Sequence, residues 1–217
     1  MSRVKWIILC LLAIFAFCTI ASSAAFAASP AWWVNGKLLA AGETAAVAEP
    51  TEVTTAFTVK STIVSGECKA VKVKTGDIEG EKQAAVNSLV FTECVDLTEP
   101  MKCTTTGFST KPLSILLEGT TGNLKLKFKP TTGVEVFTII VSNKTGQICH
   151  VAGTFRVNGT MACTYPKVET EAEKHELVFS AASGSKLTVT AGLEELALEL
   201  AGNDLFWLSS KLGWSAK

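Results

Sequence analysis

The chain has 217 residues, and its 20 basic side chains balance its 20 acidic ones. Because no positive excess is available to neutralise a phosphate backbone, the composition disfavours sequence-general nucleic-acid binding. A hydrophobic fraction of 47% is that of a globular protein and excludes a disordered chain. Thr and Val number 26 and 19. Both are β-branched and favour strands, so the composition predicts an all-β protein.

The first residues predict export. Arg3 and Lys5 precede an apolar run over Trp6–Ile20, and Ala25–Ala27 provides an A-x-A cleavage site. We therefore expect a signal helix within residues 1–27 and cleavage before Ala28. The alternative is an uncleaved anchor, because residues 6–27 are long enough to cross a bilayer. No second run of that length follows, so no membrane span is expected after cleavage, and the predicted location is extracellular or in the cell envelope.

Residues 28–217 show a side-chain period of two, interrupted by Gly, Pro and Asn, which is typical of antiparallel sheets. We predict a single β domain, a sandwich or barrel of roughly a dozen short strands, with residues 28–50 as a looser arm. The expected strands are Trp32–Val34, Lys37–Ala40, Ala56–Ser65, Lys69–Thr75, Ser88–Cys94, Leu113–Leu117, Leu124–Lys129, Glu135–Ser142, His150–Val157, His175–Ser180, Lys186–Ala191 and Leu193–Leu200.

Two local patterns bear on this assignment. Asn35-Gly36 is a two-residue hairpin signal between the first two strands. Leu193–Leu200 is compatible with a helix by residue preference. Its leucines alternate with Glu and Ala, however, and Gly192 and Gly202 bound it. We therefore assign it as a strand.

Removal of residues 1–27 leaves five cysteines: Cys68, Cys94, Cys103, Cys149 and Cys163. In an exported protein these indicate two disulfides and one unpaired thiol. The favoured pairs are Cys94 with Cys103, around a turn at residues 99–100, and Cys149 with Cys163, around a hairpin at residues 158–159. That arrangement leaves Cys68 unpaired, and a Cys68–Cys149 bridge is its main competitor.

The sequence offers no catalytic, cofactor or metal motif. His150 follows Cys149, and in a strand adjacent side chains point to opposite faces, so the two are not expected to share a metal ion. The zinc spacings of two paired cysteines or of H-E-x-x-H are missing from the sequence. Carboxylates are frequent, as at Glu194-Glu195, but their spacing does not single out a hydrolytic pair.

Four tryptophans remain after cleavage: Trp32, Trp33, Trp207 and Trp214. Adjacent strand residues face opposite ways, so only one of Trp32 and Trp33 should enter the core. The favoured interpretation is aromatic packing of the two terminal segments. The alternative is a stacking surface for sugars, which would bring the protein into contact with a glycan or the cell wall.

Several short motifs occur in a fixed order along the chain. They are Trp33–Gly36, Gly66–Cys68, Phe91–Cys94, Cys103, Cys149, Gly153–Phe155 and Gly213–Ala216. In this order the chain resembles uncharacterised exported β-rich proteins of soil actinobacteria. The resemblance covers most of residues 28–217 and implies export and a β fold, but no activity.

We therefore expect an exported, non-enzymatic β domain with a binding or structural role. One alternative is an extracellular hydrolase that cleaves polysaccharide with two carboxylates. Another is a carrier of a small ligand, if the strands close around a hollow barrel. The sequence does not define a partner.

Overall fold

The computed structural model describes residues 29–48, 53–80, 82–120 and 122–217, so the expected signal segment lies outside the described residues. The described part is all-β apart from one 3₁₀ turn at Ala181–Ser183. The strands are β1 (Trp32–Val34), β2 (Lys37–Leu38), β3 (Thr44–Ala46), β4 (Val53–Lys60), β5 (Ser65–Val73), β6 (Gly76–Glu79), β7 (Gln83–Val86), β8 (Leu89–Asp96), β9 (Cys103–Thr105), β10 (Phe108–Ser109), β11 (Leu113–Glu118), β12 (Lys125–Pro130), β13 (Glu135–Asn143), β14 (Gly153–Thr164), β15 (Lys174–Phe179), β16 (Lys186–Ala191), β17 (Glu194–Trp207) and β18 (Trp214–Ala216).

The larger sheet closes into an antiparallel barrel of eight long strands, most of them made of two or three shorter segments. In chain order these barrel strands are β3–β4, β5–β6, β7–β8, β9–β10–β11, β12–β13, β14, β15–β16 and β17. Each pairs with the next along the chain. The last, β17, returns to pair with β4 and closes the ring. Of the two expected architectures, the barrel is the one that forms.

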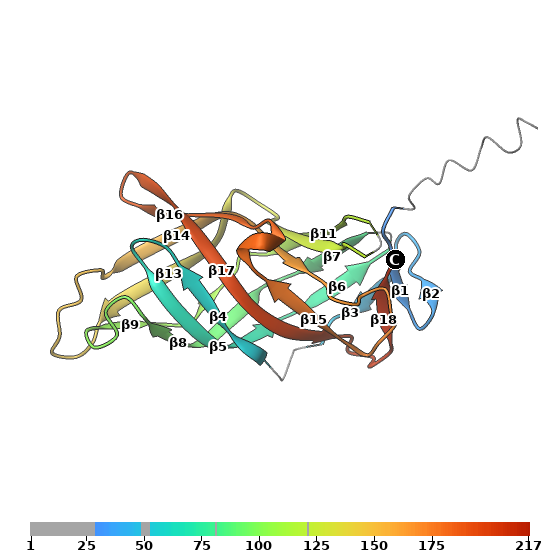
Figure 1. Cartoon of the computed structure of the whole chain (residues 1–217), viewed down its shortest axis with the longest axis horizontal. Coiled ribbons are helices and arrows are strands. Elements are labelled where there is room, and N and C mark those ends of the chain that lie inside the picture. Colours follow the sequence, from blue (N-terminus) through green and yellow to red (C-terminus); the bar gives the residue numbers. More distant parts are fainter. Residues whose placement is uncertain (1–28, 49–52, 81, 121) are drawn as a thin grey trace, which may run out of the picture.

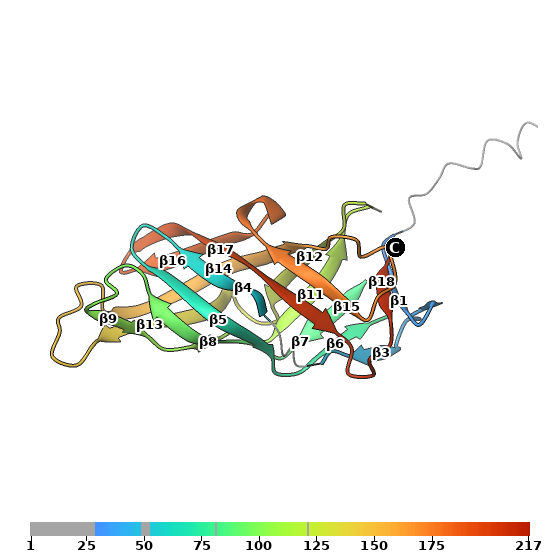
Figure 2. The ribbon, with the colours of Figure 1, turned by 60° about the horizontal axis from the view of Figure 1, so that its bottom comes forward.

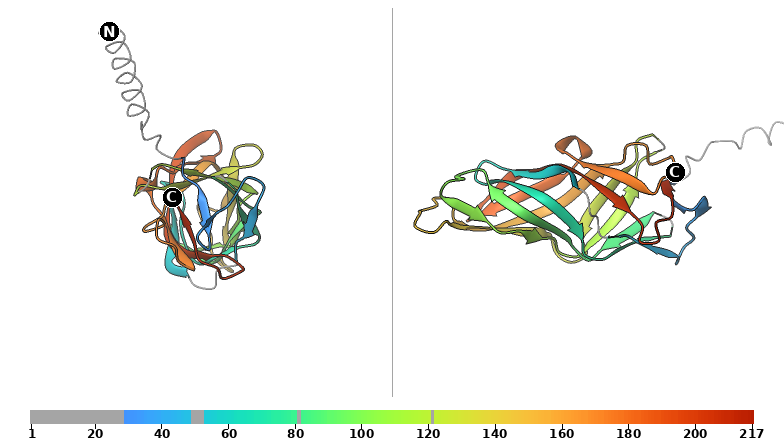
Figure 3. Two further views of the ribbon diagram at one scale, coloured as in Figure 1. Left: turned by 90° about the vertical axis from the view of Figure 1, so that its right-hand side faces the viewer. Right: turned by 90° about the horizontal axis from the view of Figure 1, so that it is seen from below.

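The barrel has two different ends (Figures 1 and 2). Because consecutive strands are antiparallel, every second connection lies at the same end. We call the end that carries the connections 61–64, 97–102, 144–152 and 192–193 the distal end. The other end, the lid end, is covered by a second sheet of order β18-β1-β2. Viewed from the lid end, the strands form a ring, and β1 passes across its opening (Figure 3, left).

The lid sheet joins the two ends of the described chain. Trp32 pairs with Ala216 and Val34 with Trp214, while β1 turns into β2 at Asn35-Gly36. Asn35 and Gly36 have φ values of 50° and 71°, as the predicted hairpin turn requires. The segment considered as a looser arm thus supplies β1 and β2 to the lid and β3 to the barrel, and Trp32 has no exposed surface.

The barrel interior is an apolar core. Inward positions alternate with outward ones, as in β11, where Leu113, Ile115 and Leu117 are buried. Eight strands leave an interior that side chains can just fill. Aromatic rings occupy its centre: Phe57, Phe91, Phe108, Phe128, Phe137 and Phe179. No helix in the described ranges is long and apolar enough to cross a membrane.

Three sequence assignments can be compared with these strands. The strand expected at residues 193–200 is confirmed as part of β17. The strand expected to start at His150 starts instead at Gly153, and residues 149–152 form a turn. The hairpin expected at Asn158-Gly159 was wrong, because both residues lie inside β14. Gly159 is needed there for close packing, since a Cβ would lie 2.0 Å from the carbonyl oxygen of Lys186.

Candidate functional site

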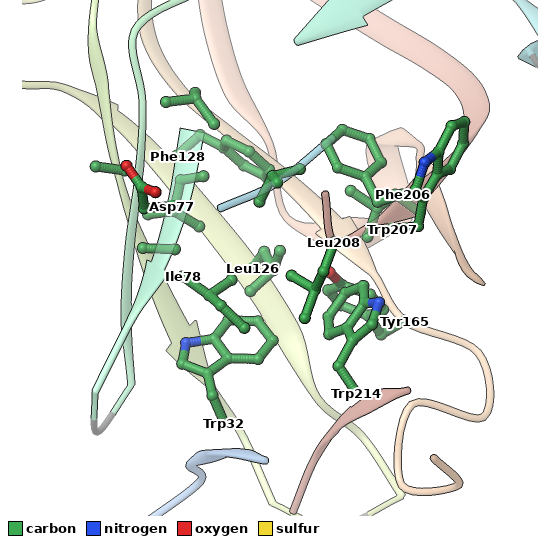
Figure 4. A pocket seen from close by; sticks show the side chains of 16 residues that line it. Trp32, Asp77, Ile78, Leu126, Phe128, Tyr165, Phe206, Trp207, Leu208 and Trp214 are labelled. Carbon is green, nitrogen blue, oxygen red and sulfur yellow. The ribbon is translucent and has the colours of Figure 1, made fainter. Parts of the chain in front are cut away.

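The barrel interior is the first candidate for a ligand site, and Figure 4 shows the side chains that line its cavity. It contains a cavity of about 30 Å³ near the lid, lined mainly by apolar side chains such as Leu126, Phe206 and Leu208. That volume is about the share of one water molecule in the liquid. In the described conformation the interior is therefore filled by side chains rather than hollow.

The lid side of this cavity is an aromatic cluster. The ring of Trp32 lies 5.8 Å from that of Trp214 and 6.3 Å from that of Tyr165 (Figure 4). Its indole N–H donates to the Gln83 carbonyl at 2.9 Å. Buried His175 contacts the Trp214 carbonyl oxygen through Nε2 at 2.6 Å. Burial lowers the pKa of His175, so the neutral ring donates this hydrogen bond and fixes the lid.

The structure separates the four tryptophans of the possible sugar-stacking surface. Trp32 and Trp214 are buried together, which confirms that one of the adjacent pair enters the core. Trp33 is half-buried, with the Lys217 ammonium group 5.4 Å from its ring centroid. Trp207 is 8% exposed and lies below Lys174. The described structure thus forms no shared platform from these residues, and glycan contact stays a prediction.

The disulfide pairing differs from the sequence assignment. Cys68 bonds to Cys94, and Cys103 bonds to Cys149. Both favoured pairs, Cys94–Cys103 and Cys149–Cys163, were therefore wrong, as was the competing Cys68–Cys149 bridge. Cys163, not Cys68, is the free thiol. It is fully buried in β14, and burial raises the pKa of its thiol, so it packs as an unreactive apolar group.

Strand pairing explains these bonds. Cys68 and Cys94 are direct partners in the β5–β8 ladder. Glu93 has a φ of 54° and interrupts the alternation of β8: before it the buried residues have odd numbers, as at Phe91, and after it the buried residue is Asp96. Cys103 begins β9 beside the end of β13, and the connection from Asn143 brings Cys149 back over it.

A polar cluster surrounds the second disulfide at the distal end. Glu99 accepts hydrogen bonds from the His150 backbone N–H at 2.9 Å and from His150 Nδ1 at 3.0 Å. These two bonds lower the pKa of the Glu99 carboxyl, against a smaller opposing effect of desolvation. The Glu99 carboxylate also lies 3.6 Å from Cys103 Sγ. The ligand atoms of Glu99, Cys103 and Cys149 all fall within 4.8 Å of one another.

The sequence analysis missed this cluster because it began a strand at His150 and therefore expected the Cys149 and His150 side chains to point to opposite faces. In the turn that forms instead, Asn143 Oδ1 accepts from the Cys149 N–H at 2.9 Å, and His150 turns towards Glu99. The position of this cluster follows from the order of the barrel strands, in which each strand pairs with the next along the chain. The connection between strands three and four (97–102) and the connection between strands five and six (144–152) then lie at the same end, which places residue 99 near residue 150.

The distal connections also expose apolar side chains. Met101 is 81% exposed, Ile148 74%, and Leu193 fully exposed. The connections 97–102 and 144–152 are joined to each other, since Lys144 donates to the Lys102 carbonyl through its N–H and to the Pro100 carbonyl through Nζ. Leu38 and Leu212 are exposed apolar residues at the lid end.

Two aspartates are buried among the described residues, Asp96 and Asp204. Asp204 on β17 has no exposed surface, and among the described residues its Oδ2 has no hydrogen-bond partner. Its Oδ1 accepts from the Leu205 N–H at 3.0 Å. Burial raises the pKa of Asp204 to about 7, although the Leu205 hydrogen bond opposes the shift. The folded protein therefore holds a proton there that the unfolded chain releases.

We expect the stability of the Asp204→Asn variant, relative to that of the native protein, to increase as the pH rises. Between about pH 4 and 7, the folded state binds one more proton at Asp204 than the unfolded state does. The free energy of unfolding of the native protein should therefore fall, relative to the variant, by about 1.4 kcal/mol per pH unit. Urea unfolding of both proteins at several pH values measures this difference. The titration of His175 affects both proteins equally and therefore cancels. A constant difference would contradict a protonated Asp204.

Comparisons with known proteins provide no relative: no family model, curated protein or solved structure matches the chain. The two disulfides are compatible with an extracellular protein.

Proposed function

We propose that the protein is an exported, non-enzymatic binding domain that contacts a protein partner in the cell envelope through its distal connections. The observation that carries this proposal is the set of exposed apolar side chains Met101, Ile148 and Leu193 on three separate connections. Large exposed apolar side chains on a soluble protein often mark a site of contact with a partner. Disulfide Cys103–Cys149 holds two of these connections in place, which lowers the entropy cost of binding.

The charges at this end favour a protein over an anionic lipid surface. Glu99 lies beside Lys102 and His150, so the connections that carry Met101 and Ile148 also carry acidic and basic side chains. Protein interfaces surround an apolar centre with a mixed polar rim, whereas anionic lipids select clusters of Lys and Arg. The predicted signal segment supports export to the envelope.

The barrel interior and the surface hollows lend less support to the two alternatives, a carrier of a small ligand and a polysaccharide hydrolase. A cavity of about 30 Å³ leaves no room for a typical small ligand, whose pockets begin at about 300 Å³. There are also two surface hollows of about 540 Å³ each. Glu199 lines one of them, and the described lining of the other contains no carboxylate. Polysaccharide hydrolysis ordinarily uses two.

Fractionation of the native host tests the proposal. The wild-type protein should sediment with the envelope, and the triple variant Met101→Ser, Ile148→Ser, Leu193→Ser should be released at least tenfold more. The matched control is Leu38→Ser with Leu212→Ser, which removes two exposed apolar residues from the lid end and should leave retention unchanged. Exposed substitutions alter stability by only about 0.5 kcal/mol, so both variants should fold.

Two outcomes would contradict this function. One is equal release of the two variants, which would show that the distal side chains are not the contact. The other is flotation of the purified wild-type protein with protein-free anionic vesicles, which would identify lipid as the bound surface.

A further inference from the structure

The polar cluster at the distal end contains the donor set of a soft metal site. Two sulfurs and one carboxylate oxygen converge, with the Glu99, Cys103 and Cys149 ligand atoms all within 4.8 Å of one another. They come from the connection 97–102, the start of β9 and the connection 144–152. Glu99 is itself oriented by two hydrogen bonds from His150. In the disulfide form neither sulfur is a thiolate, so the set is not available to a metal ion.

We propose that reduction of the Cys103–Cys149 bond creates a site for one zinc-like divalent cation, ligated by Cys103, Cys149 and Glu99. Two thiolates and a carboxylate are accepted zinc ligands, and a solvent molecule in the fourth position completes a tetrahedron. The inference is independent of the proposed binding function, because it requires no partner.

The chemistry needs an external reductant, which we take to be a dithiol. The dithiol gives two electrons and two protons to the Cys103–Cys149 bond and is oxidised to its own disulfide. The S–S bond breaks, and two thiols form. Metal binding then displaces both thiol protons to solvent, so affinity should fall as pH is lowered. The connection 144–152, released by reduction, is held again by the metal.

The surroundings distinguish this pair of cysteines from the other one. His150 Nδ1 donates to Glu99 and so orients the carboxylate that would bind the metal ion. The sulfurs of Cys103 and Cys149 are next to this carboxylate at the barrel rim. Cys68 and Cys94 instead lie among Val59, Val64, Phe108 and Ile139, without a described carboxylate in that lining. Reduction of that pair should create no metal site.

Cobalt titration of the folded protein tests the site. After anaerobic reduction by a phosphine and its removal, Co²⁺ should bind with one-to-one stoichiometry and give both thiolate charge-transfer absorption and the visible bands of a tetrahedral ion. Zn²⁺ should displace it, and native mass spectrometry should show one zinc per chain. The oxidised protein should show neither signal.

Variants assign the ligands. Glu99→Gln keeps the disulfide and can be checked for folding in its oxidised form; after reduction its Zn²⁺ affinity should fall at least a hundredfold. His150→Ala should lose about 10–100-fold, as expected of a residue that positions a ligand. The matched control is Cys68→Ser with Cys94→Ser, which removes the other pair and should retain the cobalt spectrum, provided that circular dichroism shows it folded.

Three results would overturn the proposal. The first is a reduced wild-type protein that binds no Co²⁺ while it remains folded. The second is bound Co²⁺ without thiolate absorption. The third is unchanged Zn²⁺ affinity in Glu99→Gln, which would remove the carboxylate from the site.

Discussion

Replacing Trp32 by alanine should lower the free energy of unfolding by about 3–5 kcal/mol, the usual cost of removing a buried large aromatic ring. Trp32 is fully buried at the lid end, where its ring packs against Tyr165 and Trp214. The substitution also leaves the Gln83 carbonyl without its indole donor. Urea unfolding followed by far-ultraviolet circular dichroism measures the loss without relying on tryptophan emission.

The neighbouring residue provides the control. Trp33 lies on the opposite face of β1 and is only half-buried, so Trp33→Ala should cost much less than Trp32→Ala. If the two substitutions cost the same, the lid would not be packed on the barrel as described.

Removing the distal disulfide by Cys103→Ala with Cys149→Ala should lower the free energy of unfolding by about 4 kcal/mol. The bond joins residues 46 positions apart, and the chain-entropy model gives this value for a loop of that length. Chemical unfolding of the double variant and of the wild-type protein under non-reducing conditions gives the difference.

Cys163→Ala is the appropriate comparison, because it removes a buried sulfur without opening a loop. It should cost only the loss of packing around one small side chain. A double variant no less stable than Cys163→Ala would show that the distal disulfide does not stabilise the folded chain. Intact mass after alkylation confirms that the Cys68–Cys94 disulfide remains closed in each protein.

The fold class could be predicted because it follows from local properties. The two-residue period of segments such as 113–117 fixes which side chains face inwards, and Asn35-Gly36 fixes one turn. Closure into a barrel could not be deduced in this way. It depends on β17 pairing with β4, residues more than a hundred positions apart, and no local pattern encodes that contact.

The candidate site was hidden for a related reason. Asn158-Gly159 has the sequence of a hairpin turn, yet tertiary packing keeps it inside β14, since Gly159 allows β16 to approach closely. That false turn suggested the pair Cys149–Cys163. Glu99 and His150 lie 51 positions apart, and only the common end of the meander brings them together.

The seam between β17 and β4 has a consequence for how the barrel is made. Every other barrel strand pairs with its neighbour in sequence, so those ladders can form progressively, whereas the seam must wait for both ends of the sheet. Until then the sheet has two open edges, which are templates for pairing with other chains. Gly202 lies at this seam, where a Cβ would approach Phe57 to 2.8 Å. A side chain there would hold the edges apart and prolong the aggregation-prone state.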